Sequence, residues 1–272
     1  MAQFFESPFY ALALRGVEEA LTQAGYGLVV SSGHWNADEE RRCVLHLRAR
    51  QVDGIILLTG RLEDDYLAAL AQELAVVVTG RDLVAPGLHA LRTRDEAGAR
   101  AATRHLVDLG HRRIAHLAGD PQHPDALDRE QGYRQALAEA GIPVDERLVV
   151  PGQYLECGGA NATALLLERD VPFTAIFAAN DQMAAGAAQV LHRRGLRIPQ
   201  DVSIVGFDDL LATKHASPPT TTVNLSVTEL GRRAVAAMLD LLADRPPTAS
   251  APEPALVVRE STARCQGTAG QS

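Results

Sequence analysis

The sequence is poor in lysine, aromatic residues and cysteine, and each shortage excludes a class of protein. Lys214 is the only lysine among 26 basic residues, and 34 acidic residues bring the net charge to −8. A chain this acidic lacks the concentrated basic face that binding to nucleic acid requires. The three cysteines, Cys43, Cys157 and Cys265, are too few and too widely spaced for a disulfide framework. They favour reduced thiols in a cytoplasm.

Long apolar runs and catalytic motifs are also missing. No stretch approaches the ~20 apolar residues that a membrane span needs, and MAQFFESPFY lacks the basic and apolar regions of a signal peptide. The chain contains no phosphate-binding G-x-x-x-x-G-K motif and no G-x-S-x-G nucleophile elbow. Its nine histidines show no metal-ligand spacing. We therefore expect a protein that is not an enzyme, holds no metal or cofactor, and does not contact a membrane.

The pattern that is present alternates short apolar runs with helical periodicity. Nearly continuous apolar runs are typical of parallel strands covered on both faces, and six occur, at 27–32, 53–60, 74–80, 113–120, 173–180 and 202–209. Helical patterns fall between and after them, at about 8–24, 37–50, 63–73, 95–109, 127–140, 157–168, 181–194 and 226–243. This alternation predicts an α/β fold with doubly wound sheets. Asp38 and Asp181 stand where helix N-caps are expected.

Six irregularly spaced strands favour two sheets with a ligand cleft between them. Connectors near 109–111, 223–226 and 244–254 predict one lobe from 1–107 plus 226–250 and another from 108–223 plus 253–265. Ligands in open α/β sheets bind at the carboxyl ends of strands. The polar residues that end the predicted strands are Thr59, Thr79, Asp120, Asn180 and Asp208. The Asp208–Asp209 pair, after a very apolar strand, favours ligand binding, with capping of the following turn as the alternative.

Several blocks of the chain resemble, in the same order, signatures of the lactose-repressor (LacI/GalR) family of bacterial transcriptional regulators. They include LVDLGHRRIAHLAGD (106–120), REQGYRQAL (129–137), the long block FTAIFAANDQMAAGAAQVLHRRGLRIPQDVSIVGFDDL (173–210) and PPTTTVNLSVTELGRRA (218–234). The resemblance implies a type I periplasmic-binding-protein fold, in which two Rossmann-like lobes are joined by three crossovers around a ligand cleft. The family's DNA-binding headpiece and first β-strand would precede Gln3, so we expect both to lie outside these residues.

The resemblance also assigns ligand-binding roles to particular positions. Arg129 matches an arginine that holds ligand hydroxyls or carboxylates, and Asn180 and Asp208 match a ligand-contacting amide and acid. Aromatic contacts are implied at Phe9, Tyr10 and Tyr154. The chain departs from the family at Arg94–Asp95, where an Asp-Asn pair is usual. This pair changes the charge near the cleft, and Asp95 is a further ligand-binding candidate. Without the resemblance, these residues could instead be a solvated helix charge (Arg129), a neighbour of a helix cap (Asn180) and core aromatics (Phe9 and Tyr10).

The function implied is that of the effector-binding and dimerisation domain of a regulator, usually a repressor. It would sense a small polar ligand, such as a sugar, as a cytoplasmic homodimer, and would reach operator DNA only through a headpiece. The alternative is a periplasmic sugar-binding protein of an ABC transporter, which shares the fold. An enzyme on a similar α/β frame is a more distant alternative.

Overall fold

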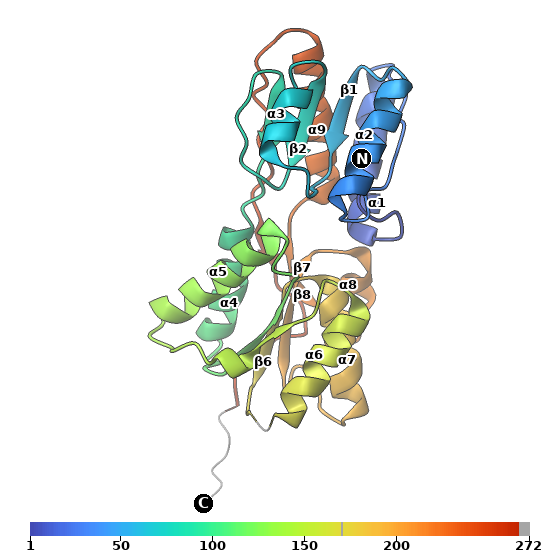
Figure 1. Ribbon diagram of the computed structural model, residues 1–272. Coiled ribbons are helices and arrows are strands. Elements are labelled where there is room, and N and C mark those ends of the chain that lie inside the picture. Colours follow the sequence, from blue (N-terminus) through green and yellow to red (C-terminus); the bar gives the residue numbers. More distant parts are fainter. Residues whose placement is uncertain (170, 267–272) are drawn as a thin grey trace, which may run out of the picture. The chain divides into compact units, whose positions relative to one another are not determined.

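The computed structural model describes residues 1–169 and 171–266, which form two compact α/β units (Figure 1). The first unit contains Met1–Thr93 and Ser226–Glu253, and the second contains Arg94–Leu225 and the segment from Pro254 onward. The chain therefore passes between the units three times. The two-lobed α/β fold with three crossovers that the sequence predicts is confirmed.

The first boundary between the units differs from the prediction. Helix α4 (Asp95–Asp108) belongs to the second unit, so the first unit ends at Thr93 and not at residue 107. There α4 packs closely along α5 (Pro124–Glu139), since a Cβ atom on Gly132 would lie 2.2 Å from the carbonyl oxygen of Glu96. The turn near 109–111 is visible in the sequence, but the sequence does not show against which sheet the preceding helix packs.

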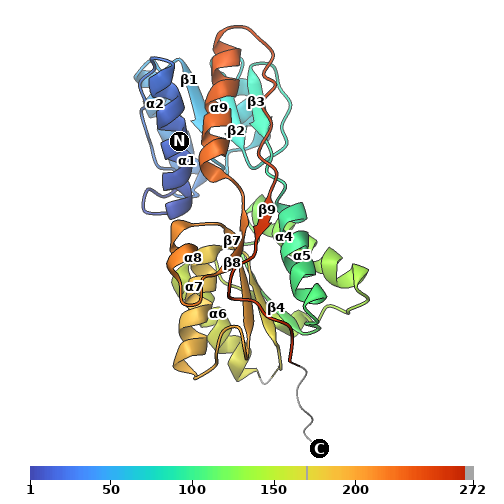
Figure 2. The same cartoon turned by 180° about the vertical axis from the view of Figure 1, so that it is seen from behind.

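The first unit is built on a parallel sheet of three strands. These are β1 (Gly54–Leu57), β2 (Ala75–Thr79) and β3 (Leu88–Leu91), in the order β1-β2-β3. Helices α2 (Ala37–Ala49) and α3 (Asp64–Leu70) cover one face, while α9 (Val227–Leu242), with α1 (Pro8–Gln23) beside it, covers the other (Figures 1 and 2). Successive side chains of β2 alternate between the faces: Val76 and Val78 pack under α2 and α3, and Val77 packs under α9.

The predicted strand at 27–32 is wrong, because this segment makes only one bridge, between Ala2 and Ser32. Its side chains Leu28, Val29 and Val30 are 38%, 41% and 37% exposed. The backbone of Met1 and Ala2 lies between this segment and β1: the Ala2 amide donates to the Ser31 carbonyl, and the Leu58 amide donates to the Met1 carbonyl, each over 3.0 Å. A regular strand needs a ladder partner along its length. Here the backbone hydrogen bonds lie at the end of the apolar run and beyond it, where Ala2 bonds to Ser31 and Gly33, and Gln3 bonds to His34.

The second unit is built on a six-stranded sheet with the order β5-β4-β6-β7-β8-β9, parallel except for β9. The strands are β4 (Ile114–Ala118), β5 (Val149–Pro151), β6 (Ala175–Ala178), β7 (Ser203–Asp208), β8 (Thr221–Asn224) and β9 (Ala255–Val257). Helices α4 and α5 cover one face (Figure 1). The other face carries α6 (Glu156–Glu168), α7 (Asp181–Arg193) and the short α8 (Leu211–His215), and a 3-10 turn at Glu146–Leu148 precedes β5.

Two helices begin differently from the prediction. The Asn36 side-chain oxygen accepts the amides of Asp38 and Glu39 at 3.0 and 3.1 Å, so Asn36 is the N-cap of α2. Likewise the Asn180 oxygen accepts the Met183 amide at 2.9 Å and caps α7. Asparagine is as good an N-cap as aspartate. Asp181 is thus the first residue of α7, and its carboxylate binds elsewhere.

Candidate functional site

The candidate site lies in the second unit, at the edge where strands β4, β6 and β7 end. Its centre is Arg129 on α5, a side chain that is only 5% exposed. Gly132, one turn further along α5, lets this helix approach the first turn of α4 without a steric clash. The close approach brings Asp95, the first residue of α4, within reach of the Arg129 guanidinium.

Three carboxylates surround that guanidinium. Its Nε donates to Asp95 Oδ1 over 2.8 Å, and one terminal nitrogen lies 3.4 Å from Asp208 Oδ1. The other terminal nitrogen is 3.8 Å from Asp125 Oδ2. A charge buried this deeply is tolerated only when it is paired. Together the four charged side chains define what we call the Arg129 cluster: Arg129, Asp95, Asp125 and Asp208.

Aromatic rings and a backbone carbonyl complete the surroundings of Arg129. The centre of the guanidinium lies 4.0 Å from the Phe207 ring centroid and 5.5 Å from that of Tyr154. A terminal nitrogen also donates to the Ala179 carbonyl. Protein groups therefore occupy several of the five donors of the guanidinium and fix its orientation.

Asp208 is held in an unusual backbone conformation at the end of β7. Its φ is +107°, and that of Asp209 is +56°. Residues other than glycine rarely adopt positive φ, and each such residue costs about 1–3 kcal/mol, a cost that functional sites often carry. Asp208 Oδ1 is buried and ion-paired with Arg129 over 3.4 Å, but it makes no hydrogen bond of standard geometry among the described residues. Burial raises the pKa of Asp208 well above its ordinary value, against the opposing effect of Arg129.

Tyr154 lies in the loop between β5 and α6, also with a positive φ, of +61°. Its ring packs directly over Gly119, where a Cβ atom would lie 2.4 Å from the ring Cζ, and stacks on His123 with 5.6 Å between centroids. Its hydroxyl is buried next to the Asp125 carboxylate and, within the described part of the chain, makes no hydrogen bond of standard geometry. Burial accordingly raises the pKa of Tyr154 well above its ordinary value. Such a hydroxyl is available to a ligand.

Asn180, which the resemblance assigns to the ligand, has a structural role in this structure. Its side-chain oxygen caps α7, and its Nδ2 donates to the Tyr154 carbonyl over 3.0 Å. The side chain thus joins the start of α7 to the loop that carries Tyr154. One hydrogen of Nδ2 is not used in these two bonds, so a contact with the ligand stays a prediction.

Phe9 and Tyr10 lie on α1 in the first unit, where their rings meet edge to face with centroids 5.4 Å apart. Tyr10 is buried, and its hydroxyl lies 3.0 Å from Thr59 Oγ1, while Phe9 is half-buried. Arg129, Asn180, Asp208, Tyr154 and Asp95 all belong to the second unit. The predicted role of the two α1 aromatics beside the ligand therefore stays a prediction.

Sequence reasoning missed two members of the site. Asp125 precedes Arg129 by one helical turn on α5, and this i,i+4 spacing is a signal that could have found it. Phe207 directly precedes Asp208 in β7, but its stacking on Arg129 depends on how the strand and α5 pack, which no spacing reveals. The departure from the family at Asp95 is visible in the sequence, whereas its consequence, a buried ion pair with Arg129, is visible only in the structure.

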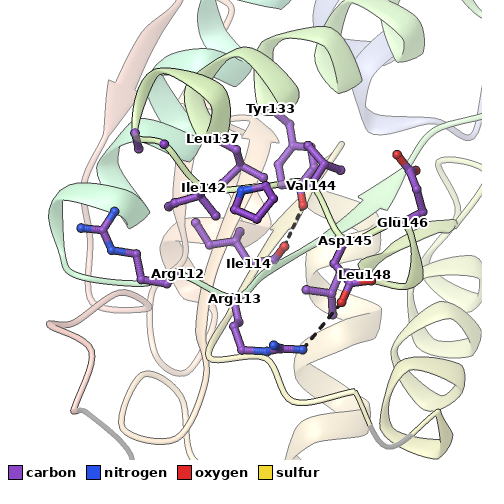
Figure 3. A pocket seen from close by; sticks show the side chains of 13 residues that line it. Arg112, Arg113, Ile114, Tyr133, Leu137, Ile142, Val144, Asp145, Glu146 and Leu148 are labelled. Carbon is purple, nitrogen blue, oxygen red and sulfur yellow. Dashed lines mark hydrogen bonds and ion pairs between the residues drawn. The ribbon is translucent and has the colours of Figure 1, made fainter.

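A separate cavity of about 670 Å³ opens at the opposite edge of the same sheet, beside the start of β4 (Figure 3). Two pairs of its polar groups bond to each other: the Tyr133 hydroxyl donates to the Ile114 carbonyl over 2.8 Å, and Arg113 lies 3.7 Å from Asp145. The Arg129 cluster is a stronger candidate for the ligand-binding site. Asp208 Oδ1 and Tyr154 Oη, at the cluster, are buried without a standard hydrogen bond, whereas no such atom among the described residues lines the cavity.

The Arg129 cluster is suited to holding hydroxyl groups. It offers carboxylate acceptors and a phenolic hydroxyl around a fixed guanidinium. In residues 1–169 and 171–266, no three histidine, cysteine or acidic side chains are grouped so as to hold a metal ion. No helix in that part of the chain is long and apolar enough to cross a bilayer.

Comparison with known proteins agrees with this architecture. Residues 103–262 match the family of periplasmic-binding-protein-like domains. The chain is 35% identical over 240 residues to the HTH-type transcriptional regulator GalR of Escherichia coli, a match that covers 88% of this chain and 70% of GalR. It is 38% identical over 263 residues to the HTH-type regulator CelR of Thermobifida fusca, which covers 95% and 75% of the two chains.

Solved structures give the same result. The complex of the transcriptional regulator CelR with cellobiose superposes with a TM-score of 0.84 at 36% identity, covering 94% of this chain and 80% of the other. A LacI family regulator from Enterococcus faecium with bound ribose superposes with a TM-score of 0.87 at 27% identity, covering 97% and 98%. With its two α/β units and this degree of identity to GalR and CelR, the chain belongs to the LacI/GalR family of transcriptional regulators.

Proposed function

We propose that this chain is the effector-binding and dimerisation domain of a transcriptional regulator, and that its effector is a sugar held at the Arg129 cluster. The observation that carries the proposal is a pair of buried polar atoms, Asp208 Oδ1 and Tyr154 Oη, which face charged groups of the cluster but make no hydrogen bond of standard geometry among the described residues. Buried polar atoms are nearly always paired, and each unpaired one costs about 1–3 kcal/mol. Ligand hydroxyls would supply the missing partners.

The charges of the cluster support an uncharged ligand. Three carboxylates surround one guanidinium, and Arg129 already shares its Nε with Asp95. A phosphate or carboxylate entering this site would meet like charge, whereas a sugar hydroxyl can donate to one oxygen and accept from another donor. Two relatives fit this reading, since the CelR structure contains cellobiose and the E. faecium structure contains ribose, whereas a sugar-binding LacI family regulator from Escherichia coli is in complex with phosphate. Phosphate is therefore included in the test below.

The relatives also favour a regulator over a transporter. GalR and CelR are HTH-type transcriptional regulators, not enzymes or periplasmic components of an ABC transporter. We infer a cytoplasmic homodimer that contacts operator DNA through a separate headpiece. The effector would act by binding one conformation of the protein more tightly than another and so shifting their populations.

Thermal unfolding with candidate ligands tests the proposal. Cellobiose, ribose, glucose and inorganic phosphate are added separately to the wild-type chain. A bound ligand at a hundredfold excess over its Kd stabilises by about 2.7 kcal/mol, which raises the unfolding midpoint by roughly 5–10 °C. We expect a sugar to give this rise and phosphate to give none.

Two variants locate the binding site. In Asp208→Asn the midpoint should no longer respond to the sugar. The matched control is Asp108→Asn, which removes an exposed carboxylate, paired with Arg104, in the same unit. This control should respond like the wild type. An unchanged response in Asp208→Asn would show that the sugar binds elsewhere.

A further inference from the structure

A buried ion pair lies directly behind the site and is not used in the proposed ligand contacts. Arg259, in the segment that follows β9, pairs with Asp209, and the two side chains are 13% and 8% exposed. The other Asp209 oxygen accepts from Asn224 Nδ2 at the end of β8, over 2.9 Å. Asp209 thus turns away from the Arg129 cluster, whereas its neighbour Asp208 turns toward it.

Arg259 fixes more than one residue of this turn. Besides Asp209, its guanidinium donates to Thr213 Oγ1 on α8 over 2.9 Å and to the Thr220 carbonyl before β8 over 2.8 Å. The planar arrangement of its donors suits three fixed acceptors, which an ammonium group on a flexible stem would not hold together. The guanidinium therefore joins the β7–α8 turn, α8 and the residue before β8 to the segment after β9.

A second anchor holds the turn from the opposite side. The Leu210 amide donates to Asp181 Oδ2 over 2.8 Å, and Thr222 donates to Asp181 Oδ1 over 2.6 Å. Gly206 leaves room for this carboxylate, since a Cβ atom there would lie 2.2 Å from Asp181 Oδ1. Residues 208–210 are thus fixed on both sides by side chains that are distant in sequence.

The backbone conformation of the β7–α8 turn explains why it needs contacts on both sides. Asp208 and Asp209 both have positive φ, so the isolated turn would relax toward ordinary conformations. Relaxation would move the Asp208 carboxylate away from Arg129, to which it lies within 3.4 Å. Something outside the turn must maintain the conformation in which Asp208 faces the site.

We propose that Asp209 and Arg259 are positioning residues, which hold the Asp208 carboxylate in its ligand-binding orientation without contacting the ligand themselves. The proposal rests on the proposed function, in which Asp208 binds a sugar hydroxyl. If only a fraction of molecules keeps the turn in place, the apparent Kd rises by the inverse of that fraction. A turn formed in one molecule in ten therefore weakens binding by about tenfold.

Calorimetric titration of cellobiose and ribose into three variants tests this assignment. Arg259→Lys keeps the charge but loses the planar set of donors, and it should weaken binding by about tenfold. Asp209→Gly combined with Arg259→Ala should restore most of the affinity that Arg259→Ala alone loses, because glycine adopts positive φ without strain. The matched control, Arg197→Ala, removes an exposed Arg–Asp pair with Asp201 in the same unit and should bind like the wild type.

The rescue separates positioning from general stabilisation, since the double variant still lacks the ion pair. Wild-type affinity in Arg259→Lys, or a double variant that binds no better than Arg259→Ala, overturns the proposal. If the wild type binds neither sugar, the proposed function fails, and hydrogen exchange at the Leu210 amide then decides the positioning role. If the Leu210 amide exchanges about tenfold faster in Arg259→Ala than in the wild type, Arg259 does hold the turn in place. An unchanged exchange rate overturns the positioning role.

Discussion

Arg129 and Asp95 are separated by 34 positions in the sequence, yet Arg129 Nε donates to Asp95 Oδ1 over 2.8 Å in a nearly solvent-free environment. The two side chains are 5% and 2% exposed. Breaking a buried pair leaves a charge without compensation, which is far more costly than losing a surface pair.

Arg129→Ala should therefore lower the free energy of unfolding by about 3–5 kcal/mol, since Asp95 and Asp208 would stay buried without their cation. Urea denaturation with tertiary and secondary structure probes measures this change. The control Arg104→Ala breaks an exposed pair with Asp108 and should cost no more than about 1 kcal/mol. Equal costs in the two variants would contradict a buried, charge-paired site.

Tyr154→Phe should change stability and binding in opposite directions. The hydroxyl is buried beside Asp125 without a hydrogen bond of standard geometry among residues 1–169 and 171–266, so its removal should leave the ligand-free protein equally stable or up to about 2 kcal/mol more stable. Sugar affinity should fall about tenfold, because one hydrogen bond made only with the ligand is lost. Denaturation and calorimetry are compared on the same samples. A variant that loses stability and keeps affinity would mean that the hydroxyl is satisfied within the protein.

The raised pKa of Asp181 predicts how the free energy of unfolding depends on pH. Burial raises its pKa from 3.8 to about 7, against hydrogen bonds from Thr222 and Leu210 that lower it. The folded state then binds a proton more readily than the unfolded state, so the contribution of this group to stability is largest below pH about 4 and is lost as pH rises to about 7.

Asp181→Asn should flatten that part of the stability profile, measured by urea unfolding between pH 4 and pH 8. Asp201 provides a contrast, because Arg197 lowers its pKa to about 2. Its contribution to stability is present above its ordinary pKa and is lost only on stronger acidification. Asp201→Asn should therefore leave the slope between pH 4 and pH 7 unchanged, and an unchanged slope in Asp181→Asn would rule out titration of Asp181 in this range.

The two hydrogen bonds of Asn180 can be separated by substitution. Asn180→Ala removes the cap of α7 and the bond to the Tyr154 carbonyl, and should cost about 1–2 kcal/mol. Asn180→Asp keeps a capping oxygen but cannot donate to the Tyr154 carbonyl. Compared with Asn180→Ala, it should recover most of the lost free energy of unfolding, while the fluorescence or amide hydrogen exchange of the Tyr154 loop should still differ from the wild type. Two variants with the same stability would indicate that the cap contributes little.

Sequence patterns predicted the long helices and the central strands because burial imposes a strong periodicity on them. The strands that were missed are short: β5 and β9 have three residues each and β3 has four, while β8, also of four residues, reads Thr-Thr-Val-Asn and so lacks a continuous apolar run. The opposite error at 27–32 has a related cause. An apolar run predicts a strand only if a partner is available, and partner availability is a property of the fold.

Family motifs in the sequence allowed individual residues of the site to be predicted, but not how those residues contact one another. Arg129 and Asp208 follow from the resemblance, and they do meet, with Arg129 on α5 and Asp208 at the end of β7. The interpretation of Asp181 as a cap was wrong, because Asn180 takes that role and Asp181 holds the Leu210 amide. Which of two adjacent polar residues caps a helix depends on the path of the backbone at its first turn, and this path is not encoded in the spacing of the motif.

The position of Met1 has a practical consequence for handling the protein. Its backbone nitrogen donates to the Ile56 carbonyl over 2.6 Å, and its carbonyl accepts the Leu58 amide over 3.0 Å. A label attached to this segment would therefore disturb the backbone hydrogen bonds along β1. Cys157 on α6 is exposed, so a thiol-reactive label can be attached there without touching this edge.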